Sequence, residues 1–146
     1  MITRETIVQH ARELIGTPFR HQARLPGVAI DCLNVVGETG LRAGIPNSED
    51  WLRDDALRVY GKTPRPDVLL AKCDEYLDRV TRIGLGDILL FAFEFNPQHF
   101  GIVSCVSPMR MIHAYPTNGV GKVVETGTDI ANLKFIRAYR FRGVEA

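Results

Sequence analysis

The sequence has little of three features that define common protein classes: cysteine, net charge and long apolar runs. Three cysteines among 146 residues are too few for a disulfide scaffold, and an odd number leaves at least one unpaired. The formal net charge is only +1, so no long-range field attracts a polyanion and nucleic acid is not an expected partner. No apolar run approaches the roughly 18 residues of a membrane span, so no membrane-spanning helix is expected.

The first residues also lack the apolar stretch of a secretory signal peptide, because Arg4, Glu5, Arg12 and Glu13 interrupt it. We therefore expect synthesis in the reducing cytoplasm, so that any work outside the cell needs another route of delivery. The length and a hydrophobic content of 45% are typical of one domain over residues 1–146, in which about 68–70% of the unfolded surface can be buried.

The first half of the chain predicts helices and the second half predicts strands. Apolar residues recur at helical spacing over residues 2–15, 31–43, 47–60 and 66–80, with Thr3 and Asp31 as N-caps of the first two segments. Five runs after Gly84 are rich in Val, Ile and Phe: DILLFAF, HFGIVSCV, MRMIHAY, KVVET and LKFIRAYRF. Short connections indicate antiparallel pairing. The expected class is α+β, with helices packed on one face of a sheet of about five strands.

Cys32 is the first candidate for chemistry, because an N-cap at Asp31 places it in the first turn of a helix. Free backbone N–H groups and the positive end of the helix dipole lie there, and such positions lower a thiol pKa to about 3.5–7.5. The same N–H groups can hold an oxyanion. Cysteine is also among the most buried residue types, so position alone leaves both readings open. Cys73 and Cys105 lie on apolar faces and are expected to pack.

The histidines supply a possible base. His99 opens the run HFGIVSCV, and alternation puts Gly101 on the same face, where it is expected to leave open space beside the imidazole. His113 lies in the next run, and a hairpin across SPMR would make His99 and His113 neighbours. A thiolate, an imidazole base and a third polar group form a nucleophile–base–orienter arrangement. His10 is expected at the surface, whereas His21 either lines a cleft or is solvated.

A metal centre would use the same side chains, but zinc ligands usually come in close pairs such as C-x-x-C or H-x-x-x-H. Neither pair occurs in the sequence. No metal or other cofactor is expected.

The order of the motifs resembles a known family. A helix is followed by GTPFRHQ, by DC at a helix start, and by GDILLF, HFGIV and MIHAY. This order is similar to that of the NlpC/P60 cysteine peptidases, and more narrowly of the phage cell-wall peptidases found with tail-assembly proteins, over residues 5–142. The resemblance implies a papain-like α+β fold and cleavage of peptidoglycan stem peptides, often between D-glutamate and a diamino acid. It further implies phage tail proteins as partners, and action at the cell wall after delivery by a tail or lysis.

The resemblance also implies roles for individual residues. Cys32 matches the nucleophile, His99 the base that opens the second strand, and His113 the third polar residue. Cys32 and His99 are then expected to form a thiolate–imidazolium pair, and His113 to orient the imidazole. Substrate binding or oxyanion support is expected from Asp31, Phe19, His21 and Gly101. The expected cleft lies between the helices and the sheet, with residues 17–30 and 96–98 at its rim.

Two positions depart from the family pattern. Leu33-Asn34 stands where a Ser-Gly or Leu-Gly pair is usual, and Phe19 stands where a tyrosine hydroxyl usually assists the sulfur. Because Phe19 has no hydroxyl, either another group such as His21 or a backbone N–H assists the sulfur in its place, or the activity is lower. The departures favour one alternative, a weakly active or inactive tail-assembly module of the same fold. A second alternative, an amidase or acyltransferase on another amide, stays open because the motifs do not determine the substrate.

Overall fold

Six antiparallel strands form the sheet around which the chain is arranged, in the order β3-β8-β4-β5-β6-β7. The computed structural model describes residues 1–20, 22–58, 65–93, 96–115 and 121–145. The strands are β3 (Leu77–Val80), β4 (Ile88–Phe93), β5 (Asn96–Val106), β6 (Met109–Tyr115), β7 (Lys122–Gly127) and β8 (Leu133–Phe141). The α+β class is confirmed, with one strand more than the sequence predicts.

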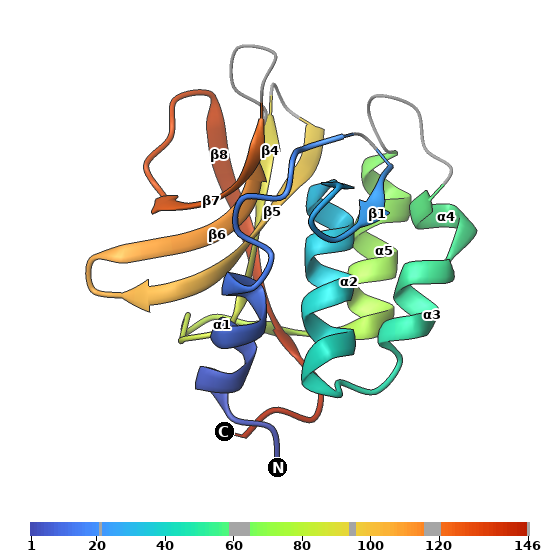
Figure 1. Cartoon of the computed structure of the whole chain (residues 1–146), viewed down its shortest axis with the longest axis horizontal. Helices are drawn as coiled ribbons and strands as arrows, with labels where there is room; N and C mark the ends of the chain where they lie inside the picture. The colour runs from blue at the N-terminus through green and yellow to red at the C-terminus, as the bar shows by residue number, and fades with distance from the viewer. Residues whose placement is uncertain (21, 59–64, 94–95, 116–120, 146) are drawn as a thin grey trace.

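The helices form a second layer against this sheet (Figure 1). They are α1 (Arg4–Arg12), α2 (Cys32–Ala43), α3 (Ser48–Arg53), α4 (Asp55–Arg58) and α5 (Pro66–Tyr76), and a small hairpin of β1 (Arg24–Leu25) and β2 (Ala29–Ile30) precedes α2. Of the helices, α1, α2 and α5 all contact β5. Within the described ranges, no helix has the length and apolar character needed to cross a membrane.

Local sequence signals set the ends of α1 and α2. The Thr3 hydroxyl accepts a hydrogen bond from the Thr6 amide at 3.1 Å, as an N-cap does. Gly44 ends α2 with φ of 84°, a left-handed conformation that glycine adopts without steric penalty. The predicted caps at Thr3 and Asp31 are confirmed.

The predicted helix over residues 66–80 is wrong in its last four residues, which form β3. The Leu77–Val80 segment pairs with β8, with Leu77 opposite Phe141 and Val80 opposite Ala138. The apolar pattern of these four residues is too short to distinguish a helix end from a strand. Pairing with the edge of β8 favours the strand, because it provides hydrogen bonds for the backbone groups of both segments.

The predicted helix over residues 47–60 is divided at Asp54, which has an extended backbone (φ −68°, ψ 115°). The Asp54 carboxylate accepts the amide N–H of Ala56 at 2.9 Å and the Tyr76 hydroxyl at 2.7 Å. These bonds favour a new helix start, so α3 ends and α4 begins on either side of Asp54. Residues 59 and 60 lie outside the described part of the chain.

Apolar side chains fill both sides of the sheet. One cluster lies between sheet and helices and includes Ile7, Val36, Trp51, Phe100 and Tyr139. A smaller one lies on the opposite face and consists of Leu89, Phe91, Val103, Met111 and Ala138. Adjacent residues of β5 therefore point into different clusters, which is the alternation expected of a strand buried on both faces.

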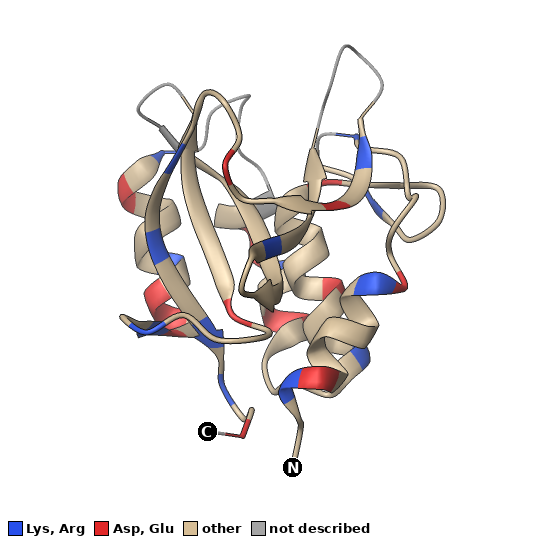
Figure 2. Cartoon of the chain, turned by 90° about the vertical axis from the view of Figure 1, so that its left-hand side faces the viewer, with Lys and Arg blue, Asp and Glu red and all other residues tan. Residues whose placement is uncertain are grey.

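A buried carboxylate ties α1 to the sheet. Asp87 is fully buried and accepts two hydrogen bonds from the Arg140 guanidinium, both at 2.8 Å, and one from the Gly84 amide at 2.7 Å. Arg4 of α1 lies 3.4 Å from the same carboxylate. Figure 2 shows β8 descending to the C-terminus with basic positions along its length, and Asp87 neutralises one of them.

We predict that Asp87→Asn lowers the free energy of unfolding by about 3 kcal/mol, the lower end for a buried ion pair that loses one partner, because Arg140 stays partly hydrated. Urea denaturation measures the change. Asp129→Asn, at an exposed position, is the matched control and should change stability by less than about 0.5 kcal/mol. Equal effects of the two variants would contradict the assigned role of Asp87.

Candidate active site

The thiol of Cys32 lies where the first turn of α2 meets the backbone of β5. Asp31, only 2% exposed, caps the helix by accepting the Asn34 amide N–H at 2.9 Å, and its second oxygen accepts the Gln22 amide N–H at 2.8 Å. The Cys32 thiol then donates to the backbone carbonyl oxygen of Gln98 at 3.3 Å. The two halves of the sequence therefore meet at this sulfur.

Burial raises the pKa of the Cys32 thiol to about 12, and the neighbouring Asp31 carboxylate acts in the same direction. The backbone amides of Phe100, Leu33 and Cys32 itself oppose this rise. These amides favour negative charge at the sulfur, as the start of a helix should, but they do not outweigh the loss of water around a side chain that is 7% exposed.

His99 begins a chain of hydrogen bonds that crosses three strands. Its Nε2 lies 2.7 Å from Nδ1 of His113, and Nε2 of His113 lies 2.8 Å from the hydroxyl oxygen of Thr126. The rings of Phe91 and Tyr115 pack at centroid distances of 6.2 and 5.8 Å from the His99 ring. The predicted juxtaposition of His99 and His113 is confirmed, and Thr126 is a member that sequence reasoning missed.

Both imidazoles are held in the neutral form. Burial lowers the pKa of His99 to about 3, with repulsion from His113 as a smaller cause, and burial lowers the pKa of His113 to about 4. His99 is 6% exposed and His113 is fully buried. A charged ring would have to give up its hydration without a carboxylate partner, which is unfavourable.

The expected resting thiolate–imidazolium pair stays a prediction, and burial of both groups acts against it. The pKa of the thiol is raised and that of His99 is lowered, and both shifts favour the neutral forms. Within the described residues, Cys32 is hydrogen-bonded to the Gln98 carbonyl and not to His99. The sulfur nevertheless lies against the β5 backbone immediately before His99.

The expectation of open space at Gly101 is also wrong. A Cβ at this position would collide with the thioether of Met111 on the neighbouring strand β6. A larger residue would require the Met111 side chain to shift, because Met111 fills the space. Gly101 thus allows close packing of β5 and β6 and does not create a binding space beside His99.

The remaining predicted binding residues have different positions. Phe19 is half-buried, packs against the core and has its amide bonded to the Gly121 carbonyl at 2.8 Å. Asp31 serves the helix start and the loop through both carboxylate oxygens. Gln98 of the predicted rim contacts Cys32 through its carbonyl, while His21 lies outside the described residues.

Asn34, one of the two departures from the family pattern, has a structural use. Its side-chain N–H donates to the carbonyl oxygen of Ala23 at 2.9 Å, which fastens the loop before α2 to the first turn of that helix. A polar side chain two residues after Cys32 indicates a hydrogen bond near the site, but the sequence does not reveal that Ala23 is its partner.

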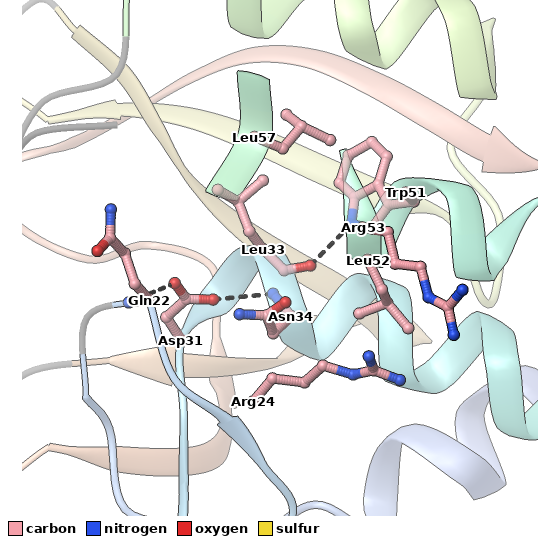
Figure 3. A pocket seen from close by; sticks show the side chains of 9 residues that line it. All are labelled: Gln22, Arg24, Asp31, Leu33, Asn34, Trp51, Leu52, Arg53 and Leu57. Carbon is pink, nitrogen blue, oxygen red and sulfur yellow. Dashed lines mark hydrogen bonds between the residues drawn. The ribbon is translucent and has the colours of Figure 1, made fainter. Parts of the chain in front are cut away.

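A cavity of about 260 Å³ begins directly beside the helix start. In Figure 3 the apolar side chains of Leu33, Trp51 and Leu57 lie together, and the guanidinium groups of Arg24 and Arg53 lie away from Leu57. Arg24 pairs with Glu38 at 2.6 Å, and Arg53 with Glu49 at 3.1 Å. Asp31 and Leu33, the neighbours of Cys32 in sequence, both line this cavity, which suits a substrate group with apolar and polar parts.

The other cysteines differ from Cys32 in their surroundings. Cys73 is fully buried in the core, and burial raises its pKa to about 12. Cys105 is half-buried on β5 beside a register shift. In the part of the chain that the structure describes, no group of three His, Cys, Asp or Glu residues is arranged to hold a metal ion.

The solved structures that this chain is similar to include NlpC/P60 domains. NlpC1 from Trichomonas vaginalis matches with a TM-score of 0.65 and 17% identity over 94% of this chain and 44% of its own. The NlpC/p60 domain of the peptidoglycan hydrolase SagA matches with a TM-score of 0.59 and 20% identity over 94% and 98%. An NLP/P60 protein similar to lipoprotein, from Staphylococcus aureus, matches with a TM-score of 0.63 and 14% identity over 98% and 42%.

These likenesses define the class of fold: the chain has the α+β fold of NlpC/P60 domains, as the motif order predicts. It spans less than half the length of two of the three structures and nearly all of the SagA domain. A scan against protein-family models finds no match, and a search of curated proteins finds none either.

The neutral histidines predict that the free energy of unfolding falls as the pH drops from about 6.5 towards 4. In this window the unfolded chain takes up protons on histidine, whose ordinary pKa is 6.5, whereas the folded chain does so only near its lowered values of about 4 and 3. Each ring contributes at most about 1.4 kcal/mol per pH unit.

Urea denaturation at a series of pH values across the window checks this. The double variant His99→Gln/His113→Gln should show a shallower slope, because it lacks both groups that remain neutral only when folded. Parallel slopes for the two proteins would show that these histidines do not contribute to the acid sensitivity.

Proposed function

We propose that the chain is a cysteine hydrolase that cleaves amide bonds in peptidoglycan stem peptides, with Cys32 as nucleophile, His99 as base and His113 as the group that orients it. One observation carries the proposal: the thiol at the start of α2 lies against the β5 backbone next to a histidine whose far nitrogen is already bonded to a second histidine. The likeness to a peptidoglycan hydrolase domain supports the substrate class.

The mechanism begins from a neutral pair. On substrate binding, the Cys32 thiol leaves the Gln98 carbonyl and passes its proton to Nδ1 of His99 as the sulfur attacks the amide carbon. Backbone N–H groups of Cys32 and Leu33, which already favour negative charge at the sulfur, hold the developing oxyanion. His99 then protonates the leaving amine, and water attacks the thioester to release the acid and restore the thiol.

Neutrality makes the proton transfer dependent on substrate. A buried thiolate and imidazolium are unfavourable in isolation, but they form next to each other and to helix N–H groups once the carbonyl is in place. We propose that the cavity beside Asp31 and Leu33 holds part of the peptide and that backbone N–H groups supply the help that a tyrosine at position 19 would otherwise give.

A second candidate is an inactive module of the same fold, and the hydrogen bond from Cys32 to Gln98 favours it, because a nucleophile would more directly be bonded to its base. The two candidates differ in whether removal of the sulfur changes the chemistry of purified cell wall.

We predict that Cys32→Ala lowers the release of peptide fragments from purified peptidoglycan by more than about 10³-fold, measured by mass spectrometry of the soluble products. The matched control is Cys105→Ser, which removes a thiol from β5 that has no place in the mechanism and should leave release unchanged. Full release by Cys32→Ala would refute Cys32 as the nucleophile and with it the cysteine hydrolase. A folded wild-type chain that releases nothing would favour the inactive module.

We also propose that the chain reaches the cell wall with a phage tail or on lysis, which makes phage tail proteins its partners. The support is the resemblance of its motif order to the phage branch of the family. Mass spectrometry of purified particles from the host strain should then detect the chain together with tail proteins. Its recovery only from the cell envelope of particle-free cultures would contradict this route.

A further inference from the structure

The hydrogen-bond chain that starts at His99 does not end at His113. The Thr126 hydroxyl oxygen lies 2.8 Å from Nε2 of His113 and donates its own proton to the Gly127 carbonyl, also at 2.8 Å. A hydroxyl has one proton and a carbonyl oxygen has none. With that proton on Gly127, the Thr126 oxygen can only accept from His113, which assigns the proton of His113 to Nε2.

The position of this proton determines the next one. A neutral imidazole has one N–H and one bare nitrogen, and burial keeps both rings neutral. With Nε2 protonated, Nδ1 of His113 is bare and accepts from the His99 ring at 2.7 Å. His99 therefore carries its proton on Nε2, and its Nδ1 keeps the lone pair that a base needs.

We propose that Thr126 is a positioning residue that sets the tautomers of His113 and His99 and so keeps Nδ1 of His99 available as the base. The inference rests on the proposed function, because a bare Nδ1 matters only if it takes the thiol proton. Thr126 does not touch the reacting atoms and acts through His113.

The sheet holds Thr126 in place for this task. Thr126 lies opposite Met111 in the ladder between β6 and β7, while His113 lies opposite Val124. Residues two apart on a strand share a face, so Met111, His113 and Thr126 all point to the same side. A hydroxyl at this diagonal position reaches the far nitrogen of His113 without any movement of the backbone.

The reverse arrangement is the alternative that Thr126 disfavours, because its hydroxyl would have to leave the Gly127 carbonyl and donate to Nε2 of His113. With His113 protonated on Nδ1, its N–H would donate to Nε2 of His99 and force the proton of His99 onto Nδ1. That ring cannot accept a proton from Cys32. Without the Thr126 oxygen, Nε2–H of His113 would be a buried donor lacking a partner, which favours the reverse arrangement.

The test compares Thr126→Val, which keeps the shape but removes the oxygen, with Thr126→Ser, which keeps the oxygen. Nitrogen-15 NMR of the histidine rings reads the tautomers directly, without substrate. We expect the Nε2–H form of both rings in the wild type and in Thr126→Ser, and the Nδ1–H form in Thr126→Val. Thr128→Val, on a threonine with no side-chain hydrogen bond within the described residues, is the matched control and should match the wild type.

Kinetics on stem peptides supply the second readout. We expect Thr126→Val to lower kcat about 10²-fold, as for a lost general base, with KM unchanged, and Thr126→Ser to restore it. An Nδ1–H form of His99 in the wild type, or unchanged tautomers or unchanged kcat in a folded Thr126→Val, overturns the proposal. A wild type that shows the expected tautomers but does not hydrolyse the peptide would refute the proposed function and leave the tautomer assignment standing.

Discussion

The buried carboxylate of Asp31 is the interaction on which the geometry of the site depends. One oxygen holds the first turn of α2 through Asn34, and the other holds the preceding loop through Gln22. A carboxylate that is 2% exposed is stable only while its oxygens accept hydrogen bonds. Because these bonds fix helix and loop together, Cys32, the next residue, has one position relative to both. The bond from the Asn34 side chain to Ala23 is a second link between the same two segments.

Burial acts on the pKa values of Cys32 and His99 in opposite directions, and both shifts favour the neutral form. It raises the pKa of the Cys32 thiol and lowers that of His99, because each loses the water that would stabilise its charged form. Burial therefore favours the neutral thiol over the thiolate. In the proposed mechanism, the backbone amides and the bare imidazole nitrogen act together when a carbonyl binds and charge develops between them. The same desolvation that suppresses charge at rest strengthens each hydrogen bond to the oxyanion.

Local patterns predicted what local interactions decide. The cap at Asp31, the place of Cys32 and the pairing of His99 with His113 follow from helix-start chemistry, strand alternation and a short hairpin. The errors come from partners distant in sequence. Residues 77–80 became a strand because β8 offered an edge, and Gly101 is filled by a methionine from β6. Thr126 was missed because its role depends on the register of β7 against β6.

That register is set by apolar side chains on both sides of the sheet. In β6, Met111 belongs to one hydrophobic cluster, whereas Ile112 and Ala114 belong to the other. A slip of one residue would send each of them to the wrong face, and the clusters therefore oppose it. The same slip would move Thr126 to the face away from His113 and break the chain of hydrogen bonds from His99 to Thr126. The hydrophobic pattern of the strand thus specifies the tautomer of a histidine, since the core fixes which polar atoms meet.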